Sequence, residues 1–265
     1  MDRLVAAAGA VRQGAVVTVE DFRAYYTWRS WLGGWLVRLL CQVLFFSQLA
    51  TLVGDSGYVV HVVLGASLMI GVLQAMQGAS TMVRDLLLGT MPLLAASPAE
   101  PGCFFLGRSL CWPLSGVAAG SIVLLSMSPF FGASWTLVQV PLVVFLVLLT
   151  TLATYCMALV LGAVALVVPM ANNLLSSLGN MGTTVLCGAI TPVHFWPEPV
   201  QAIARTLPAT HGLSALLLLE ADAGLGPTAW AAGRAVLAGL CWLALGLAVY
   251  RLLFSRARRG GALLA

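Results

Sequence analysis

The chain has 265 residues, of which 60% are hydrophobic and only 8% are charged, and its formal net charge is +4. A soluble globular domain carries about 25% charged residues, so this chain has too few to cover a water-facing surface. No charged residue occurs between Arg108 and Glu198, which leaves room for about three spans of about 20 residues each. A transmembrane barrel would show short alternating segments instead of long apolar runs. The composition therefore predicts an all-α polytopic membrane protein.

The first 34 residues are polar to amphipathic and lack the apolar core of a secretory signal. Arg23 and Arg29 alternate here with the aromatic residues Phe22, Tyr25, Tyr26, Trp28, Trp31 and Trp35. Aromatic rings and arginine side chains both suit the headgroup layer of a membrane. Two interpretations are open. We favour an N-terminal interfacial helix within residues 1–34, on the cytoplasmic face, over an aromatic girdle that belongs to the first span.

Six apolar runs in the remaining sequence are long enough to cross a membrane. We expect transmembrane helices at about residues 35–54, 58–82, 103–127, 136–160, 174–191 and 229–253. Turn-forming sequences such as "GDSGY" and "PMANN" separate some of them, because Gly, Pro and Asn disfavour continued helix. Two longer connections remain, at 84–102 and 193–225. We therefore expect one transmembrane domain that comprises residues 1–265.

The arginines predict the orientation of the chain in the membrane, since cytoplasmic loops carry the excess of basic residues. With six spans, both termini share one side, and that side collects Arg3, Arg12, Arg23, Arg29, Arg84, Arg108, Arg251, Arg256, Arg258 and Arg259. The opposite side holds Arg205. Arg234 lies just inside the last span, where it either snorkels outward or pairs with Glu198, Glu220 or Asp222. Both termini and segment 84–102 are thus expected to be cytoplasmic, and segment 193–225 extracytoplasmic.

The cytoplasmic connection reads "RDLLLGTMPLLAASPAEPG". Its apolar stretch is interrupted by Gly89 and Pro92 and is too short to span a membrane. A short helix with an apolar face has two interpretations here. It lies on the membrane surface, or it docks in a groove of a partner protein.

The extracytoplasmic connection contains "PVQAIARTLP", in which Val200, Ile203, Ala204 and Leu207 share one helical face. Pro199 suits the first turn of a helix and Pro208 is expected to end it. Thr210 is a candidate N-cap for a second short helix, "THGLSALLLLE". The two predict an extracytoplasmic re-entrant helical hairpin that dips into, or caps, the outer leaflet.

Few residues carry a recognisable chemistry. The sequence contains neither a phosphate-binding G-x-x-x-x-G-K-[ST] loop nor His or Cys residues at metal-ligand spacing. We therefore expect no catalytic residue, no metal site and no cofactor bound by this chain. The alternative that stays open is an intramembrane lipid-modifying enzyme with His194, His211 and Glu198 at its outer face.

Two passages are shared with a known family. The first lies between the second and third spans and consists of Arg84, Asp85, Gly89, Thr90, Leu94, Ser97 and Pro98, followed by Gly107 and Arg108. The second follows the fifth span and consists of Gly188, Pro192, Pro197, Leu207, Pro208, Thr210 and His211. With these passages, six spans and a basic lead, the whole chain resembles the permease subunit of a type-2 ATP-binding-cassette exporter.

The resemblance implies a transmembrane subunit of an ATP-driven exporter in a bacterial cytoplasmic membrane. Two such permeases, identical or similar, would form a dimeric path for a hydrophobic or amphipathic substrate: a drug, an antibiotic, a lipid or a lipid-linked glycan. ATP and Mg²⁺ would bind to two separate ATPase subunits, and no nucleic acid is implied as a partner. Segment 84–102 would be the coupling helix, with the residues of the first passage on the ATPase.

The second passage would supply the extracytoplasmic gate, formed by Pro192, Pro197, Leu207, Pro208, Thr210 and His211. Spans two and five would line the translocation path. Their glycines, Gly71, Gly78, Gly179 and Gly182, are expected to let helices approach closely.

Overall fold

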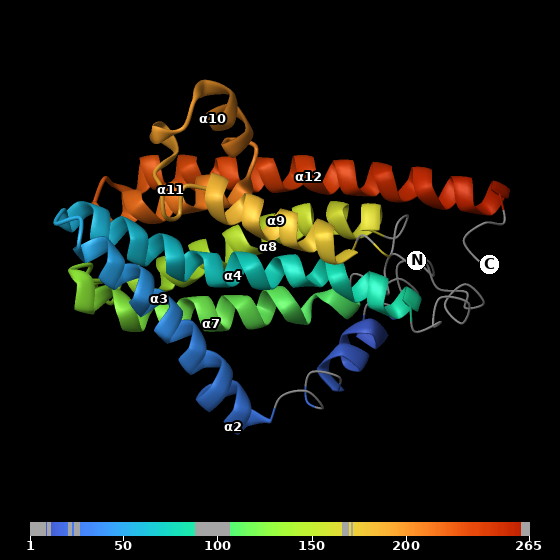
Figure 1. Cartoon of the computed structure of the whole chain (residues 1–265), viewed down its shortest axis with the longest axis horizontal. Coiled ribbons are helices and arrows are strands. Elements are labelled where there is room, and N and C mark those ends of the chain that lie inside the picture. Colours follow the sequence, from blue (N-terminus) through green and yellow to red (C-terminus); the bar gives the residue numbers. More distant parts are fainter. Residues whose placement is uncertain are drawn as a thin grey trace.

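The computed structural model describes residue 9, residues 12–20, residue 23, residues 27–87, residues 107–165, residue 170 and residues 172–260. These residues form helices joined by turns, and no β-strand occurs among them. Most of the helices run side by side along the long axis of the molecule (Figure 1). The all-α fold expected from the composition is confirmed.

Within the described residues, five helical segments are long and apolar enough to cross a membrane: Trp31–Thr51, Ser56–Thr81, Gly107–Phe131, Gln139–Ala165 and Leu225–Val249. The first consists of η1 (Trp31–Leu36) and α3 (Val37–Thr51), directly after α2 (Trp28–Ser30). The others belong to α4 (Ser56–Leu87), α7 (Cys111–Met127) with η2 (Ser128–Phe131), α8 (Gln139–Ala165) and α12 (Leu225–Gly260). The chain is therefore a multi-pass membrane protein. The boundaries lie within a few residues of the predicted ones.

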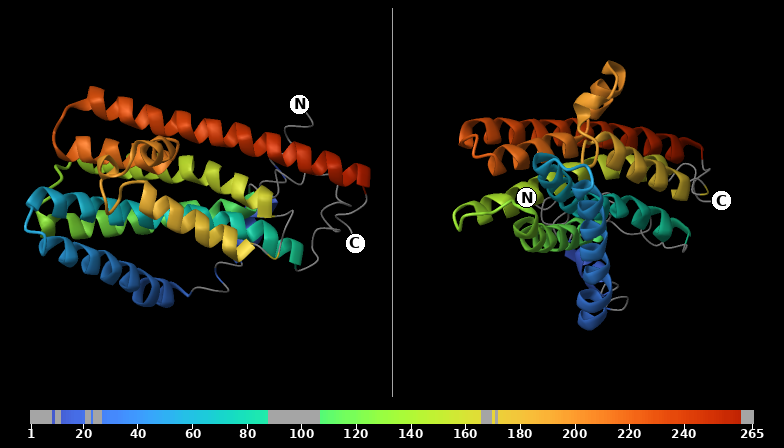
Figure 2. Two further views of the ribbon diagram at one scale, coloured as in Figure 1. Left: turned by 45° about the horizontal axis from the view of Figure 1, so that its top comes forward. Right: turned by 60° about the vertical axis from the view of Figure 1, so that its left-hand side comes forward.

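The bundle has two distinct ends (Figures 1 and 2). One end, called the loop end below, holds the turns at 52–55, 132–138 and 221–224. The other, called the terminal end, holds the helix of residues 12–20, the end of α4 at Leu87 and the end of α12 at Gly260. Successive long helices therefore alternate in direction between the two ends.

The N-terminal helix is shorter than residues 1–34. Residues 12–20 form one helix, and a second helical stretch runs from Trp28 through η1 into α3. Trp31 and Trp35, with ring centroids 5.6 Å apart, thus belong to the helix of the first span. A position of these two rings in an aromatic girdle at the membrane surface stays a prediction. An interfacial position for residues 12–20 stays a prediction.

The fifth span departs most from expectation. Helix α9 (Asn172–Leu186) has 15 residues and ends short of the predicted end at 191. At 1.5 Å per residue it is about 22 Å long, less than the thickness of about 30 Å of a hydrocarbon core. The chain then passes through η4 (Val193–Phe195) into two helices, α10 (Glu198–Ala204) and α11 (Pro208–Glu220), whose axes are bent by 87°.

Helix α4 lies at the centre of the bundle and contacts α3, α7, α8, α9 and α11. It passes α7 closely because glycines face each other. A Cβ atom added to Gly116 would lie 2.7 Å from Gln74 Cβ and 2.9 Å from the carbonyl oxygen of Gly71. Small residues at such crossings let membrane helices gain van der Waals contact along their backbones.

Three of the four glycines expected at helix contacts lie at such a contact, and the fourth does not. Gly71 faces α7, Gly78 lies against Tyr155, and Gly179 lies against Leu161 and Met76. Nothing lies within 4 Å of a Cβ atom added to Gly182, so that glycine is at no helix contact within the described chain.

Candidate functional site

The coupling residues predicted from the sequence fall at the terminal end or outside the described residues. Arg84 and Asp85 lie in the last turns of α4, which continues without a break to Leu87. The remaining predicted residues, Gly89, Thr90, Leu94, Ser97 and Pro98, lie outside the described part of the chain. Helix resumes at Gly107, at the same end of the bundle, and leads into α7.

A contact missed by the sequence reasoning joins the N-terminal helix to this region. Thr18 is 6% exposed, and its hydroxyl lies 2.6 Å from the carbonyl oxygen of Arg108 and 2.9 Å from that of Gly14. Threonine in a helix commonly bonds the carbonyl one turn earlier, so the bond to Gly14 is local. The bond to Arg108 instead ties residues 12–20 to the start of the third span. No sequence motif signals such a contact.

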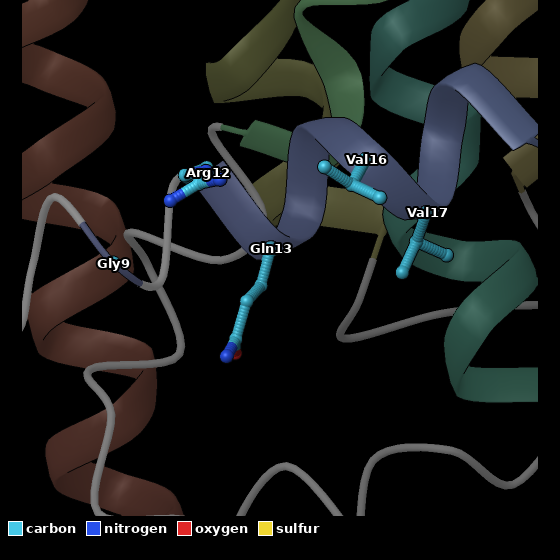
Figure 3. A pocket seen from close by; sticks show the side chains of 5 residues that line it. All are labelled: Gly9, Arg12, Gln13, Val16 and Val17. Atoms are coloured by element: carbon cyan, nitrogen blue, oxygen red, sulfur yellow. The ribbon is translucent and has the colours of Figure 1, made fainter.

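The same helix presents apolar side chains beside an open pocket. Gly9, Arg12, Gln13, Val16 and Val17 line the pocket, and Figure 3 shows the side chains of the last four along the helix, with Gly9 apart from it. Val16 is 54% exposed and Val17 is 43% exposed. With Arg12 one turn away, this face has the apolar and basic character of a membrane-surface helix.

Helix α9 and the turn that follows it are in contact with α4. The hydroxyls of Ser80 and Ser176 share a hydrogen bond of 3.0 Å, and His61 Nε2 lies 2.7 Å from the carbonyl oxygen of Gly188. Gly188 has a φ of +89°, a conformation that a residue with a side chain rarely adopts. The side chain of His61 therefore binds the backbone of the turn that ends α9.

The turn between α10 and α11 is held by three side chains. Thr210 Oγ1 donates to the carbonyl of Ala204 over 2.7 Å, and Trp242 Nε1 of α12 donates to that of Thr206 over 2.9 Å. His211 Nε2 lies 2.8 Å from the carbonyl of Arg205 and carries the proton, because a carbonyl oxygen only accepts. The last carbonyls of any helix lack partners, and Pro208 has no N–H to offer them.

This turn explains the "LP-x-TH" passage and corrects two expectations. Pro208 begins α11, with Leu207 as its N-cap, whereas α10 already ends at Ala204. Thr210 is therefore not an N-cap: its hydroxyl caps the carbonyl end of the preceding helix. The sequence correctly identified Pro208 and Thr210 as helix-end residues, but it assigned each of them to the wrong one of the two helices.

The predicted gate residues lie along this segment. Pro192 and Pro197 flank η4, and Pro197 is the N-cap of α10. Leu207, Pro208, Thr210 and His211 are buried, and a side chain on the next residue, Gly212, would collide with Thr150 of α8. Of the predicted apolar face of α10, Ala204 and Leu207 are buried, whereas Ile203 is 54% exposed.

The histidines that at first sight suit catalysis make structural contacts instead. His61 and His211 each bind a backbone carbonyl, and the ring of His194 packs on Phe195 with centroids 4.3 Å apart. No group of three His, Cys, Asp or Glu residues in the described part of the chain is arranged to hold a metal ion. Nor is Arg234 paired: among the described residues the recorded ion pair is Arg23–Glu20.

Comparison with known proteins gives one match. The family model described as "ABC-2 type transporter" matches residues 16–221, from the N-terminal helix through α11. A search of curated proteins finds no match. The matched region is well over half of the chain and contains the Thr18–Arg108 contact, four of the five long spans and the whole α10–α11 turn. The chain belongs to the ABC-2 type transporter family.

Proposed function

We propose that the chain is the membrane subunit of an ATP-driven exporter. Two copies, or one copy and a similar permease, form a path for a hydrophobic or amphipathic substrate. ATP with Mg²⁺ is hydrolysed on two separate ATPase subunits. The observation that carries the proposal is the family match over residues 16–221, on a chain with five long apolar helices and a bent helix pair. The resemblance noted in the sequence supports the same assignment.

The proposed coupling route starts at segment 84–102, docked on an ATPase. Helix α4 is continuous from the loop end to Leu87, and α7 is packed against it through Gly71 and Gly116. A displacement applied between these helices at the terminal end acts on both, since closely packed helices move as rigid elements. The Thr18–Arg108 hydrogen bond links the N-terminal helix to α4 and α7, so the displacement would also act on that helix.

The proposed exit gate is the segment 193–225, on the side of the membrane opposite the termini. The excess of basic residues on the side of the termini supports a cytoplasmic position for both termini in a bacterial cell. A hydrophobic or amphipathic substrate is supported by the spans, because the chain is uncharged between Arg108 and Glu198 and has no row of charges there to conduct an ion.

The test uses the full transporter in inverted membrane vesicles. Leu94→Pro breaks helix within the coupling segment, and Leu94→Ala is its matched control because alanine favours helix. We expect the proline variant to insert at normal levels, to lose substrate-stimulated ATP hydrolysis and to stop exporting, while the alanine variant keeps both activities. Normal export by Leu94→Pro with a normal ATPase response would refute the coupling assignment.

A further inference from the structure

Helix α12 runs parallel to α8, and the two begin at the same level. At the loop end, Gln139 Nε2, on the first residue of α8, lies 3.4 Å from Asp222 Oδ1, which comes just before α12. Further along, a Cβ atom added to Gly246 of α12 would lie 3.2 Å from Val160 Cγ2 of α8. Both residues lie about 30 Å from the first residue of their own helix. The two helices therefore stay in step along their shared length.

Helix α12 continues past the described end of α8. It has 36 residues, whereas α8 has 27, so it extends about 13 Å beyond the level of Ala165. Among the described residues, α8 and α11 are its main packing neighbours. Figure 1 shows α12 passing the ends of the other helices at the terminal end. Residues 251–260 are called the α12 extension below.

The α12 extension is strongly basic. It reads "RLLFSRARRG", and no acidic residue occurs within residues 223–265. At 100° per residue its arginines fall within one half of the helix, and the other half is apolar. The basic half comprises Arg251, Arg256, Arg258 and Arg259, and the apolar half comprises Leu253, Phe254 and Ala257. Leu252, which belongs to the basic half, is 62% exposed.

The arginines are spread along the helix and do not lie at one depth. The apolar window of α12 ends at Val249, and the headgroup layer of a bilayer is about 5–8 Å thick on each side. Arg251 lies about 3 Å past Val249, within that layer, whereas Arg258 and Arg259 lie about 13–15 Å past it. A membrane surface therefore reaches one end of the basic half. A protein that stands beside the helix reaches all of it.

The proposed function puts a protein at this height. Helix α4 has 32 residues, so Leu87 lies about 47 Å from the loop end, and the proposed coupling segment 84–102 begins there. Arg258 lies about 50 Å from the same end. An ATPase docked on segment 84–102 is therefore level with the α12 extension. An acidic surface on that ATPase is complementary in charge to the basic half.

We propose that the α12 extension is a second docking site for the ATPase subunit, and that its basic half binds an acidic surface of that subunit. This inference rests on the proposed function, because it needs an ATPase at the terminal end. The two docking sites differ in chemistry. Segment 84–102 offers a mainly apolar stretch, whereas the α12 extension offers charge, whose attraction weakens as salt screens it.

The test compares two sets of substitutions at the same four positions, in inverted membrane vesicles that carry the full transporter. One variant carries Arg251→Gln, Arg256→Gln, Arg258→Gln and Arg259→Gln. The matched control carries lysine at the same positions and keeps the charge. After a wash in about 0.1 M salt, we expect the glutamine variant to retain at least fivefold less ATPase per permease than wild type, and the lysine variant to stay within twofold. In about 1 M salt, where the Debye length is about 3 Å, wild type is expected to fall to the level of the glutamine variant.

A photoreactive residue identifies what covers the helix. Ser255 lies in the basic half, and Ala257 lies on the opposite side of the helix. A photoreactive residue at position 255 is expected to cross-link to the ATPase. The same residue at position 257 is the control, and its yield with the ATPase is expected to be at least fivefold lower.

Three results overturn the inference. They are equal retention of ATPase by the glutamine variant and wild type in about 0.1 M salt, equal losses in the lysine and glutamine variants, and cross-linking from position 255 to lipid without the ATPase. In each case the exporter proposal keeps its own test at Leu94. Wild-type vesicles that retain no ATPase after the same wash would overturn both the docking site and the exporter proposal, so the two failures are distinguishable.

Discussion

Trp242→Phe is expected to destabilise the chain through one hydrogen bond. The substitution keeps an aromatic ring in place and removes Nε1, which donates to the carbonyl of Thr206 over 2.9 Å. That carbonyl lies in the α10–α11 turn, where Pro208 has no N–H to replace the lost donor. Water is scarce at this depth, so the oxygen stays without a partner.

The size of the effect follows from the cost of an unmade bond. Thr206 is exposed on the surface of the chain, and side-chain hydrogen bonds in membrane proteins average about 0.6 kcal/mol with a maximum of about 1.7. We therefore expect Trp242→Phe to lower the free energy of unfolding by about 0.6–1.7 kcal/mol. That change raises the fraction of unfolded chain about 3- to 18-fold.

The assay is reversible unfolding in mixed micelles by a denaturing detergent, followed by circular dichroism. Trp230→Phe is the matched control, because Trp230 lies on the same helix and is 71% exposed. The control is expected to stay within about 0.5 kcal/mol of wild type, as exposed substitutions usually do. Equal unfolding free energies for the two variants would show that the bond to Thr206 contributes nothing, and the account of this turn would be wrong.

Three further outcomes are expected. Gly116→Ala places a methyl group 2.7 Å from Gln74 Cβ, so it should lower the free energy of unfolding by about 1–3 kcal/mol. The control Gly233→Ala, whose added methyl group has nothing within 4 Å, should not lower it. Equal effects of the two substitutions would contradict the close crossing of α4 and α7. His211→Gln keeps a donor near the position of Nε2 and should retain export. His211→Ala removes the donor and should lower the free energy of unfolding by about 1–3 kcal/mol. If His211 were catalytic, both variants would lose activity equally. Thr18→Val removes the bond to Arg108, so proteolytic cleavage next to residues 12–20 should become at least twofold faster than in the wild-type chain. Unchanged cleavage would show that other contacts hold the helix.

The sequence predicted those parts of the fold that depend on composition and periodicity. Long apolar runs located α4, α7, α8 and α12 to within a few residues, because hydrocarbon requires about 20 apolar residues whatever they pack against. Helical spacing also predicted that Ala204 and Leu207 face inward, which they do. Exposed Ile203 shows the limit of this reasoning, since periodicity identifies a face without saying how much of it another element covers.

The features that sequence reasoning missed depend on contacts between distant segments. Thr18 and Arg108 are 90 residues apart, and neither belongs to a pattern that announces the other. Trp242 was counted as part of a span, yet its ring nitrogen closes a turn 36 residues earlier. Proline and threonine at 208 and 210 were correctly chosen as helix-end residues. Thr210 was assigned to the wrong helix because a threonine hydroxyl can cap either end of a helix, and only the path of the backbone shows which end it caps.

The topology of the bundle requires α9, α10 and α11 to count as one interrupted crossing. Helix α8 begins at the loop end, and so does α12, with Ala165 and Gly260 toward the terminal end (Figure 1). An odd number of crossings must therefore connect Ala165 to Leu225, and α9 to α11 supply that connection. Within this crossing Gly188 contacts His61, which lies about 8 Å along α4 from its start at the loop end. The chain then turns back toward the middle of the bundle, where Thr206 contacts Trp242, and α11 leads to the loop end again.

Such a path explains the composition of residues 188–211. A crossing that reverses direction inside the bundle exposes backbone carbonyls where no water is available, so it needs prolines to set the bends and side chains to bind the free carbonyls. His61, Thr210, His211 and Trp242 perform the second task. Broken helices at membrane depth occur where protein or a water-filled cavity covers them. The same rule requires a cover for the exposed side chains of Glu198 and Arg205 if they lie at membrane depth.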